Sequence, residues 1–189
     1  SADFRIDNKS IFEKWYKLPH QATKEQKKSI YGLSEINRNL IKKSNFIACP
    51  GCYPTSILLP LLPLVKNKLI NTNSIKADSK SGYSGAGKKT TDKKLYPNIN
   101  ENISIYGVGQ HRHMPEIDQE LSKSSKKKIK ISFTPHLIPT FRGILSTIYL
   151  DLPKGIKIKK VKDCLLNFYK KEKFVNVVNS KEMINTNRV

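Results

Sequence analysis

Cys52 is the residue of this chain best suited to nucleophilic chemistry. It lies in the segment 48–55 (ACPGCYPT), between a short apolar run at 45–48 that predicts a strand and a longer run at 56–65 that predicts a buried helix. Pro54 suits the first turn of that helix, where an N–H group has no intrahelical partner. Cys52 is therefore expected just before a helix N-terminus, where unpaired amides and the helix dipole favour a thiolate.

The other two cysteines offer alternatives that must be weighed. An isolated cysteine is more often an inert apolar residue than a nucleophile, so Cys52 needs partners. Cys49 gives a Cys-x-x-Cys spacing, which is typical of a redox pair or of half a metal site. The sequence has no second such pair, and Cys164 falls on an amphipathic stretch where it is expected in the core. The sequence therefore predicts neither a metal site nor a thioredoxin-like role.

A second cluster of reactive side chains contains His111, Arg112, His113 and Glu116. It follows an apolar run and would supply an acid, a base and a cation for an anion. His113 and Glu116 are three residues apart, so on a helical turn the carboxylate is expected to orient the imidazole. We therefore favour His113 slightly over His111 as the acid–base group, with both left open. A solvated basic turn is the alternative interpretation.

Arg142 is one of only five arginines in a chain that otherwise uses lysine. Its planar guanidinium suits a carboxylate or a phosphate, which it can bind through two parallel hydrogen bonds. A surface cation is the alternative. The small-residue loop 81–87 (SGYSGAG) exposes backbone amides, but it lacks the spacing of a P-loop.

Composition limits the class of protein. With 189 residues the chain is about one domain or slightly more, and its three cysteines favour a reducing cytoplasm over a disulfide framework. Pro60 and Pro63 interrupt its longest apolar run, which is too short to cross a bilayer. The net charge of +20 suggests nucleic-acid binding, but the lysines are spread evenly along the chain. A lysine-rich version of an ordinary fold explains the charge equally well.

The order of predicted elements indicates the fold class. From residue 50 onward the pattern is helix, strand, strand, helix, strand, strand, helix, strand, which is typical of an α+β fold with a mixed sheet covered by helices. The predicted strands and helices lie at 45–48, 54–68, 74–81, 103–108, 114–123, 130–134, 143–150, 158–169 and 174–178. Upstream, 1–20 predicts the end of a strand and a loop, followed by short helices near 22–30 and 35–43.

Six short motifs together resemble the N-acetyl-gamma-glutamyl-phosphate reductase family, and they occur in that family's order. They are SADFR (1–5), YGLSE (31–35), PGCYPT (50–55), SGYSGAG (81–87), HRHMPEI (111–117) and PHLIP (135–139) with Arg142-Gly143. The resemblance implies a glyceraldehyde-3-phosphate dehydrogenase-like catalytic domain. Residues 1–50 would be the C-terminal portion of a dinucleotide-binding Rossmann domain, and 51–189 a C-terminally truncated catalytic and dimerisation domain.

The resemblance also implies a reaction and its residues. An NADPH-dependent enzyme of arginine biosynthesis would reduce N-acetyl-glutamyl 5-phosphate to the 5-semialdehyde, with Cys52 forming a thioester and His111 or His113, with Glu116, transferring protons. The other implied residues are Arg112, Arg142 and Ser81 for the substrate, and Ser81, Gly82 and Pro50 for the cofactor. Cys49 stands where the family usually has Asn, and Lys88 where Arg is usual.

The resemblance further implies a cytoplasmic homo-oligomer, a dimer or tetramer, with no metal, no membrane contact and no nucleic-acid partner. Two other functions remain as alternatives. One is a related reductase that acts on a carrier-linked aminoadipyl phosphate or on an aspartyl phosphate. The other, from a different class, is a basic nucleic-acid-binding module. Because this chain would lack the N-terminal part of the Rossmann domain, we expect it to be inactive by itself.

Overall fold

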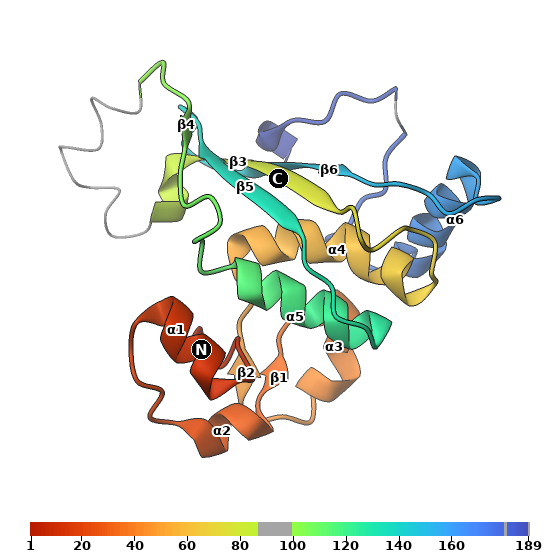
Figure 1. The fold of residues 1–189 in the computed structure, drawn as a ribbon. Helices are drawn as coiled ribbons and strands as arrows, with labels where there is room; N and C mark the ends of the chain where they lie inside the picture. Colours follow the sequence, from red (N-terminus) through yellow and green to blue (C-terminus); the bar gives the residue numbers. More distant parts are fainter. Residues whose placement is uncertain (87–99, 180, 189) are drawn as a thin grey trace.

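Helix α4 (Cys52–Lys66) lies at the centre of the molecule, and the other elements pack around it (Figure 1). The structure is a computed structural model that describes residues 1–86, 100–179 and 181–188. Gly87, at the end of the small-residue loop, and Lys88 lie outside these residues.

Helix α4 is apolar on nearly all sides because it is buried on nearly all sides. Tyr53, Ile57, Leu58 and Leu61 all have at most 2% of their surface exposed. The helix continues through Pro60 and Pro63. Pro63 has no N–H group for the Leu59 carbonyl four residues earlier, and the Tyr169 hydroxyl donates to that carbonyl instead. None of the helices in the described residues has the length and apolar character that a membrane span requires.

A mixed four-stranded sheet lies against α4, in the order β4-β5-β3-β6. Its strands are β3 (Lys76–Ser81), β4 (Ser104–Ile105), β5 (Ser132–Leu137) and β6 (Ile144–Tyr149). Strand β3 is parallel to β5 and antiparallel to β6, and Ser81 pairs with both Leu137 and Ile144. Helix α4 contacts β6 and packs against α5 (Met114–Ser125) and α6 (Ile158–Tyr169). The predicted α+β fold with a mixed sheet is confirmed.

The first 48 residues form a smaller layer below α4 and α5 in Figure 1. They contain α1 (Lys9–Tyr16), α2 (Thr23–Lys28), β1 (Ile30–Tyr31), α3 (Ser34–Ile41) and β2 (Ile47–Ala48). Strands β1 and β2 pair in parallel. One hydrophobic core joins the two layers, since Tyr31, Leu33 and Ala48 belong to the same cluster as the buried face of α4.

Two of the predicted elements are wrong. A loop was expected over 1–20, but Asn8 caps helix α1 by accepting from the Ile11 amide at 3.0 Å, and Phe12 stacks on Tyr16. A strand was expected at 174–178, but none forms there, and Phe174 is 94% exposed. A strand needs a neighbouring strand to satisfy its backbone, so a suitable run of residues is not sufficient. The chain ends with a short 3-10 helix, η2 (Thr186–Arg188).

We predict that Asp118→Asn stabilises the protein at neutral pH. Burial raises the pKa of the Asp118 carboxyl to about 6, so its contribution to stability is full below the unfolded value and is lost as the pH rises through 6. The amide can still accept the Ile131 N–H bond that Asp118 accepts at 3.1 Å. Urea unfolding should show a gain of about 1 kcal/mol at pH 7.5 that shrinks at pH 4.5.

The exposed Asp163→Asn variant is the control for a general charge effect in this prediction. An equal gain for both variants, or a gain for Asp118→Asn that does not depend on pH, would contradict it.

Candidate active site

Cys52 is the first residue of α4, two positions earlier than the predicted start of the helix, and its side chain is exposed. Gly51 is the N-cap, and its carbonyl accepts both the Thr55 amide and the Thr55 hydroxyl at 2.9 Å. Because Pro54 has no N–H group, the amides of Cys52 and Tyr53 are the donors of the first turn that lack an intrahelical partner. The thiol therefore stands at the amino end of a rigid, buried helix.

The three residues before Cys52 are each held by a side chain from elsewhere in the chain. Arg5 donates to the carbonyls of Cys49 and Pro50, the latter at 3.2 Å. The Gly51 amide donates to Glu116 Oε1 at 2.8 Å. The loop 49–51 is thus fixed from two sides.

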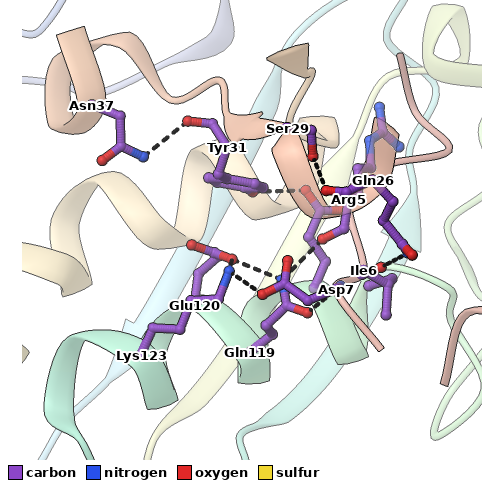
Figure 2. Close-up of polar contacts among 11 residues, drawn as sticks. Arg5, Ile6, Asp7, Gln26, Ser29, Tyr31, Asn37, Gln119, Glu120 and Lys123 are labelled. Atoms are coloured by element: carbon purple, nitrogen blue, oxygen red, sulfur yellow. Dashed lines mark hydrogen bonds and ion pairs between the residues drawn. The ribbon is translucent and has the colours of Figure 1, made fainter. Parts of the chain in front are cut away.

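Arg5 is itself anchored to helix α5. Figure 2 shows the polar contacts around it. Gln119 donates from Nε2 to the Arg5 carbonyl at 3.0 Å and accepts the Asp7 amide at 2.8 Å. Lys123 lies 2.7 Å from both Asp7 and Glu120. The chain's first residues therefore connect α5 to the loop that carries Cys52.

Glu116 is fully buried, and its position differs from the expectation. Its Oε1 accepts from Gly51 and, at 2.7 Å, from the Tyr31 hydroxyl, while Oε2 has no hydrogen-bond partner among the described residues. Burial raises the pKa of this carboxyl. The predicted contact with His113 is not formed, because the carboxylate points to α4 and β1 and His113 Nδ1 has no partner among the described residues.

The two histidines lie side by side, with ring centroids 4.8 Å apart. The His113 amide donates to His111 Nδ1 at 3.2 Å, so the proton of neutral His111 is on Nε2. The buried His113 ring lies against Gly51, since a Cβ added there would be 2.5 Å from His113 Nε2. His113 thus remains a candidate acid–base group through its contact with the residue before Cys52, and not through Glu116.

Both histidines are uncharged at neutral pH. Burial, helped by Arg112, lowers the pKa of His111 to about 4. Burial, then His111 and the cations Arg5 and Arg112, lower the pKa of His113 to about 3. A neutral imidazole has one unprotonated nitrogen that can accept a proton, and its N–H is only a very weak acid. At pH 7 the described residues around Cys52 therefore include two potential bases, His111 and His113, and the cation Arg112.

We predict that an NMR titration will show no protonation of His111 or His113 between about pH 5.5 and 8. In the unfolded chain these two imidazoles take up protons near pH 6.5, and in the folded chain they do not. The stability of the fold is therefore lost as the pH falls from about 6.5 towards 4. The Hε1 resonances can be assigned with His111→Gln and His113→Gln variants. A midpoint between pH 6 and 7 for either ring would contradict the prediction.

One cavity of about 560 Å³ brings most of the predicted residues together. Its lining includes Cys52, Ser81, Gly82, His111, Arg112 and His113. These residues come from the start of α4, the end of β3 and the segment before α5. The juxtaposition combines a thiol, two imidazoles, a guanidinium and backbone amides, which is a suitable set for acyl transfer.

Three predicted residues lie outside this lining. Glu116 is behind Gly51, and Pro50 is bound through its carbonyl to Arg5. Arg142 lies over the Phe141 ring at 5.1 Å. Its backbone is nevertheless next to the cavity, because the Gly82 amide donates to the Gly143 carbonyl at 2.9 Å and a Cβ on Gly82 would be 2.7 Å from the Phe141 carbonyl oxygen.

Sequence reasoning missed the tyrosines of the cavity. The hydroxyls of Tyr53 and Tyr106 are 2.8 Å apart, and Tyr53 also donates to the His136 carbonyl at 3.2 Å. Burial raises the pKa of both phenols. Tyr53 follows Cys52 within a recognised motif and could have been identified from it, whereas nothing in the sequence around Tyr106 marks it as a cavity residue. No group of three or more potential metal ligands occurs in the described residues.

Comparisons with known proteins identify the family of this chain. A family model described as "Semialdehyde dehydrogenase, dimerisation domain" matches residues 52–189. The chain is 47% identical over 189 residues to a probable N-acetyl-gamma-glutamyl-phosphate reductase, chloroplastic, of Arabidopsis thaliana, covering 100% of this chain and 47% of that protein. It is 47% identical to the N-acetyl-gamma-glutamyl-phosphate reductase of Alkaliphilus metalliredigens (strain QYMF), covering 100% of this chain and 55% of that protein.

Solved structures give the same fold at lower identity. Aspartate semialdehyde dehydrogenase from Francisella tularensis matches with a TM-score of 0.59 at 17% identity, covering 78% of this chain and 54% of that one. Aspartate semialdehyde dehydrogenase II from Vibrio cholerae matches with a TM-score of 0.57 at 20% identity, covering 77% and 51%. The chain spans about half the length of the curated relatives it matches. The resemblance and the implied fold are confirmed, and the chain belongs to the semialdehyde dehydrogenase family.

Proposed function

We propose that this chain is the thiol-bearing part of an NADPH-dependent reductase that converts N-acetyl-glutamyl 5-phosphate to N-acetyl-glutamate 5-semialdehyde and phosphate in arginine biosynthesis. The observation that carries the proposal is the position of Cys52 at the amino end of α4, in one cavity with His111, Arg112 and His113. The names of the relatives support the choice of substrate.

The covalent step uses this chain's own residues. A neutral imidazole, that of His113 or His111, takes the proton from Cys52. The Sγ atom attacks the acyl carbon, and the bond from that carbon to the phosphate oxygen breaks. Phosphate departs, and the acyl group remains bound to Cys52 as a thioester. The Cys52 and Tyr53 amides stabilise the developing oxyanion. Arg112, with Arg142 and Ser81, binds the phosphate or the carboxylate.

The remaining proton transfer follows from the same groups. NADPH, when bound, supplies the hydride that reduces the acyl group on Cys52. The imidazolium gives its proton to the oxygen of the resulting thiohemiacetal. When that adduct collapses, the imidazole takes the proton back, the C–S bond breaks, and the aldehyde leaves the Cys52 thiolate, which the imidazolium then reprotonates. Ser81, Gly82 and Pro50 are proposed to contact the nicotinamide. The small residues Gly82, Gly85 and Ala86 line the cavity, which leaves room for a flat ring beside Cys52.

The domain assignment is part of the proposal. Residues 1–50 would be the C-terminal portion of a dinucleotide-binding domain, and 51–189 would form the catalytic domain. The parallel pair β1–β2 and the start of the family match at Cys52 support this division. The dimerisation-domain description supports a homo-oligomer, which we propose is a cytoplasmic dimer or tetramer.

The test uses the full-length protein that combines this chain with a dinucleotide-binding part. In the oxidative direction, NADP+ reduction should require both inorganic phosphate and N-acetyl-glutamate 5-semialdehyde. Its kcat/KM should exceed that for aspartate semialdehyde or a carrier-linked aminoadipate semialdehyde by about 100-fold or more. A preference for either of those aldehydes, or phosphate-independent turnover, would overturn the substrate assignment. Tight, salt-sensitive DNA binding without turnover would favour the basic binding module.

A further inference from the structure

Gly51 is the junction between the two helices that carry the candidate catalytic groups. It precedes Cys52 at the start of α4, and the side chain of His113, the N-cap of α5, packs against it. Its carbonyl is bound by Thr55, within α4, and its amide is bound by Glu116, in the first turn of α5. The position of Cys52 relative to α5 therefore depends on the Gly51 amide.

We propose that Glu116 is a positioning residue for the Cys52 nucleophile, and that it acts by accepting the Gly51 amide. The role rests on the proposed function, since it assumes that Cys52 is the reacting thiol. Glu116 would not touch the substrate. It would fix the direction in which the first turn of α4 presents Cys52 to the cavity.

The contacts of Glu116 favour this role over a general structural one. Two donors that are 65 and 85 positions away along the chain, the Gly51 amide and the Tyr31 hydroxyl, converge on the same Oε1 atom. The bond to Gly51 is buried, so loss of the acceptor leaves an unpaired N–H, which the loop can satisfy only by moving. The residue that would move with the loop is Cys52.

Glu120 provides a matched control on the same helix. It is also buried, at 8% exposure, and lies about one turn after Glu116. Its carboxylate accepts from Gln119 and Lys123, at 2.8 and 2.7 Å, so it reaches the loop 49–51 only indirectly, through Gln119 and Arg5. Replacement of Glu120 removes a buried carboxylate from α5 but leaves the Gly51 bond in place.

The experiment compares Glu116→Ala, Glu116→Asp, Glu116→Gln and Glu120→Ala in the full-length protein. Two readouts are used: the rate at which iodoacetamide alkylates Cys52 at pH 7, followed by peptide mass spectrometry, and kcat with KM. Glu116→Ala and Glu116→Asp should lower the alkylation rate and kcat by about tenfold, with KM changed less than about twofold. Aspartate keeps the carboxyl group, but its shorter side chain moves the acceptor oxygen away from the Gly51 amide.

Glu116→Gln should restore both readouts to within about threefold, because the amide oxygen still accepts from Gly51. Glu120→Ala, which affects the loop only indirectly, should lower both by less than about threefold, well below the effect of Glu116→Ala. If Glu116→Ala does not fold, Glu116→Asp and Glu116→Gln decide the question. Unchanged Cys52 alkylation in folded Glu116→Asp, or equal losses in Glu120→Ala, would overturn the proposal. Failure of the proposed function instead appears as an inactive wild-type protein, and the alkylation rates remain interpretable.

Discussion

Cys52→Ser in the full-length protein is expected to lower kcat by about 1000-fold or more, whereas Cys49→Ser should lower it less than about threefold. Serine keeps the size of the side chain, but its hydroxyl is a far weaker nucleophile at neutral pH. Cys52 lines the cavity with His111 and His113, and its backbone holds the first position of α4. The substitution therefore removes the reacting atom and leaves the helix intact.

Cys49 is the matched control, since it is exposed and three residues away. The loop is bound through the Cys49 backbone, with its amide donating to Ser1 at 2.9 Å and its carbonyl accepting from Arg5. Serine preserves these backbone bonds. Intact-mass analysis after mixing with the acyl phosphate should show an acyl adduct in Cys49→Ser and none in Cys52→Ser. Wild-type turnover in Cys52→Ser would disprove the assignment of the nucleophile.

Local patterns in the sequence predict most of the helices and strands from residue 51 onward. The prediction of a helix at 158–169 matches α6, because a lysine-rich outer face and regularly spaced apolar residues can be recognised without tertiary information. Strand β6 lies within its predicted range, 143–150. The sequence predicts Cys52 just before a helix start, because Pro54 suits a first helical turn, and in the structure Cys52 is the first residue of α4. These features depend on residues that are close together along the chain.

Features that depend on distant segments were not predictable in the same way. The spacing of His113 and Glu116 suggested a contact between them, but the carboxylate binds Gly51 and Tyr31 from other elements. Arg5 belongs to one of the recognised motifs, but the motif does not reveal its bonds to Cys49 and Pro50. Those bonds depend on how the first residues pack beside β2. The same limit applies to Tyr106, whose hydroxyl reaches Tyr53 across the cavity.

The structure also changes what the histidines are expected to do. An imidazole with a pKa near 3 or 4 is a weak base in the free protein. A phosphate group bound at Arg112 would offset the positive field that helps to lower both values, and so favour the protonated ring. Proton transfer from Cys52 to an imidazole would then be coupled to the binding of the substrate.

Gly51→Ala is expected to have the second largest effect, because it places a methyl group against the side chain of His113, a candidate acid–base group. The added Cβ would lie 2.5, 2.8 and 2.9 Å from the Nε2, Cδ2 and Cε1 atoms of His113. Gly51 has φ −70° and ψ 158°, which alanine adopts without strain, so the effect is steric. Since His113 is buried, its ring cannot move away freely. We expect kcat to fall by about 10- to 100-fold and stability to fall by about 1–3 kcal/mol.

A double-mutant cycle on stability identifies the cause. His113→Ala removes the ring that the new methyl group would strike, so Gly51→Ala should cost little more in that background than replacement of an N-cap glycine by alanine, about 0.5–1 kcal/mol. Urea unfolding of the wild type, both single variants and the double variant should therefore give a coupling energy of about 1–2 kcal/mol. Additive effects would show that the methyl group acts on the backbone of α4 instead, and that Gly51 does not set the distance between Cys52 and His113.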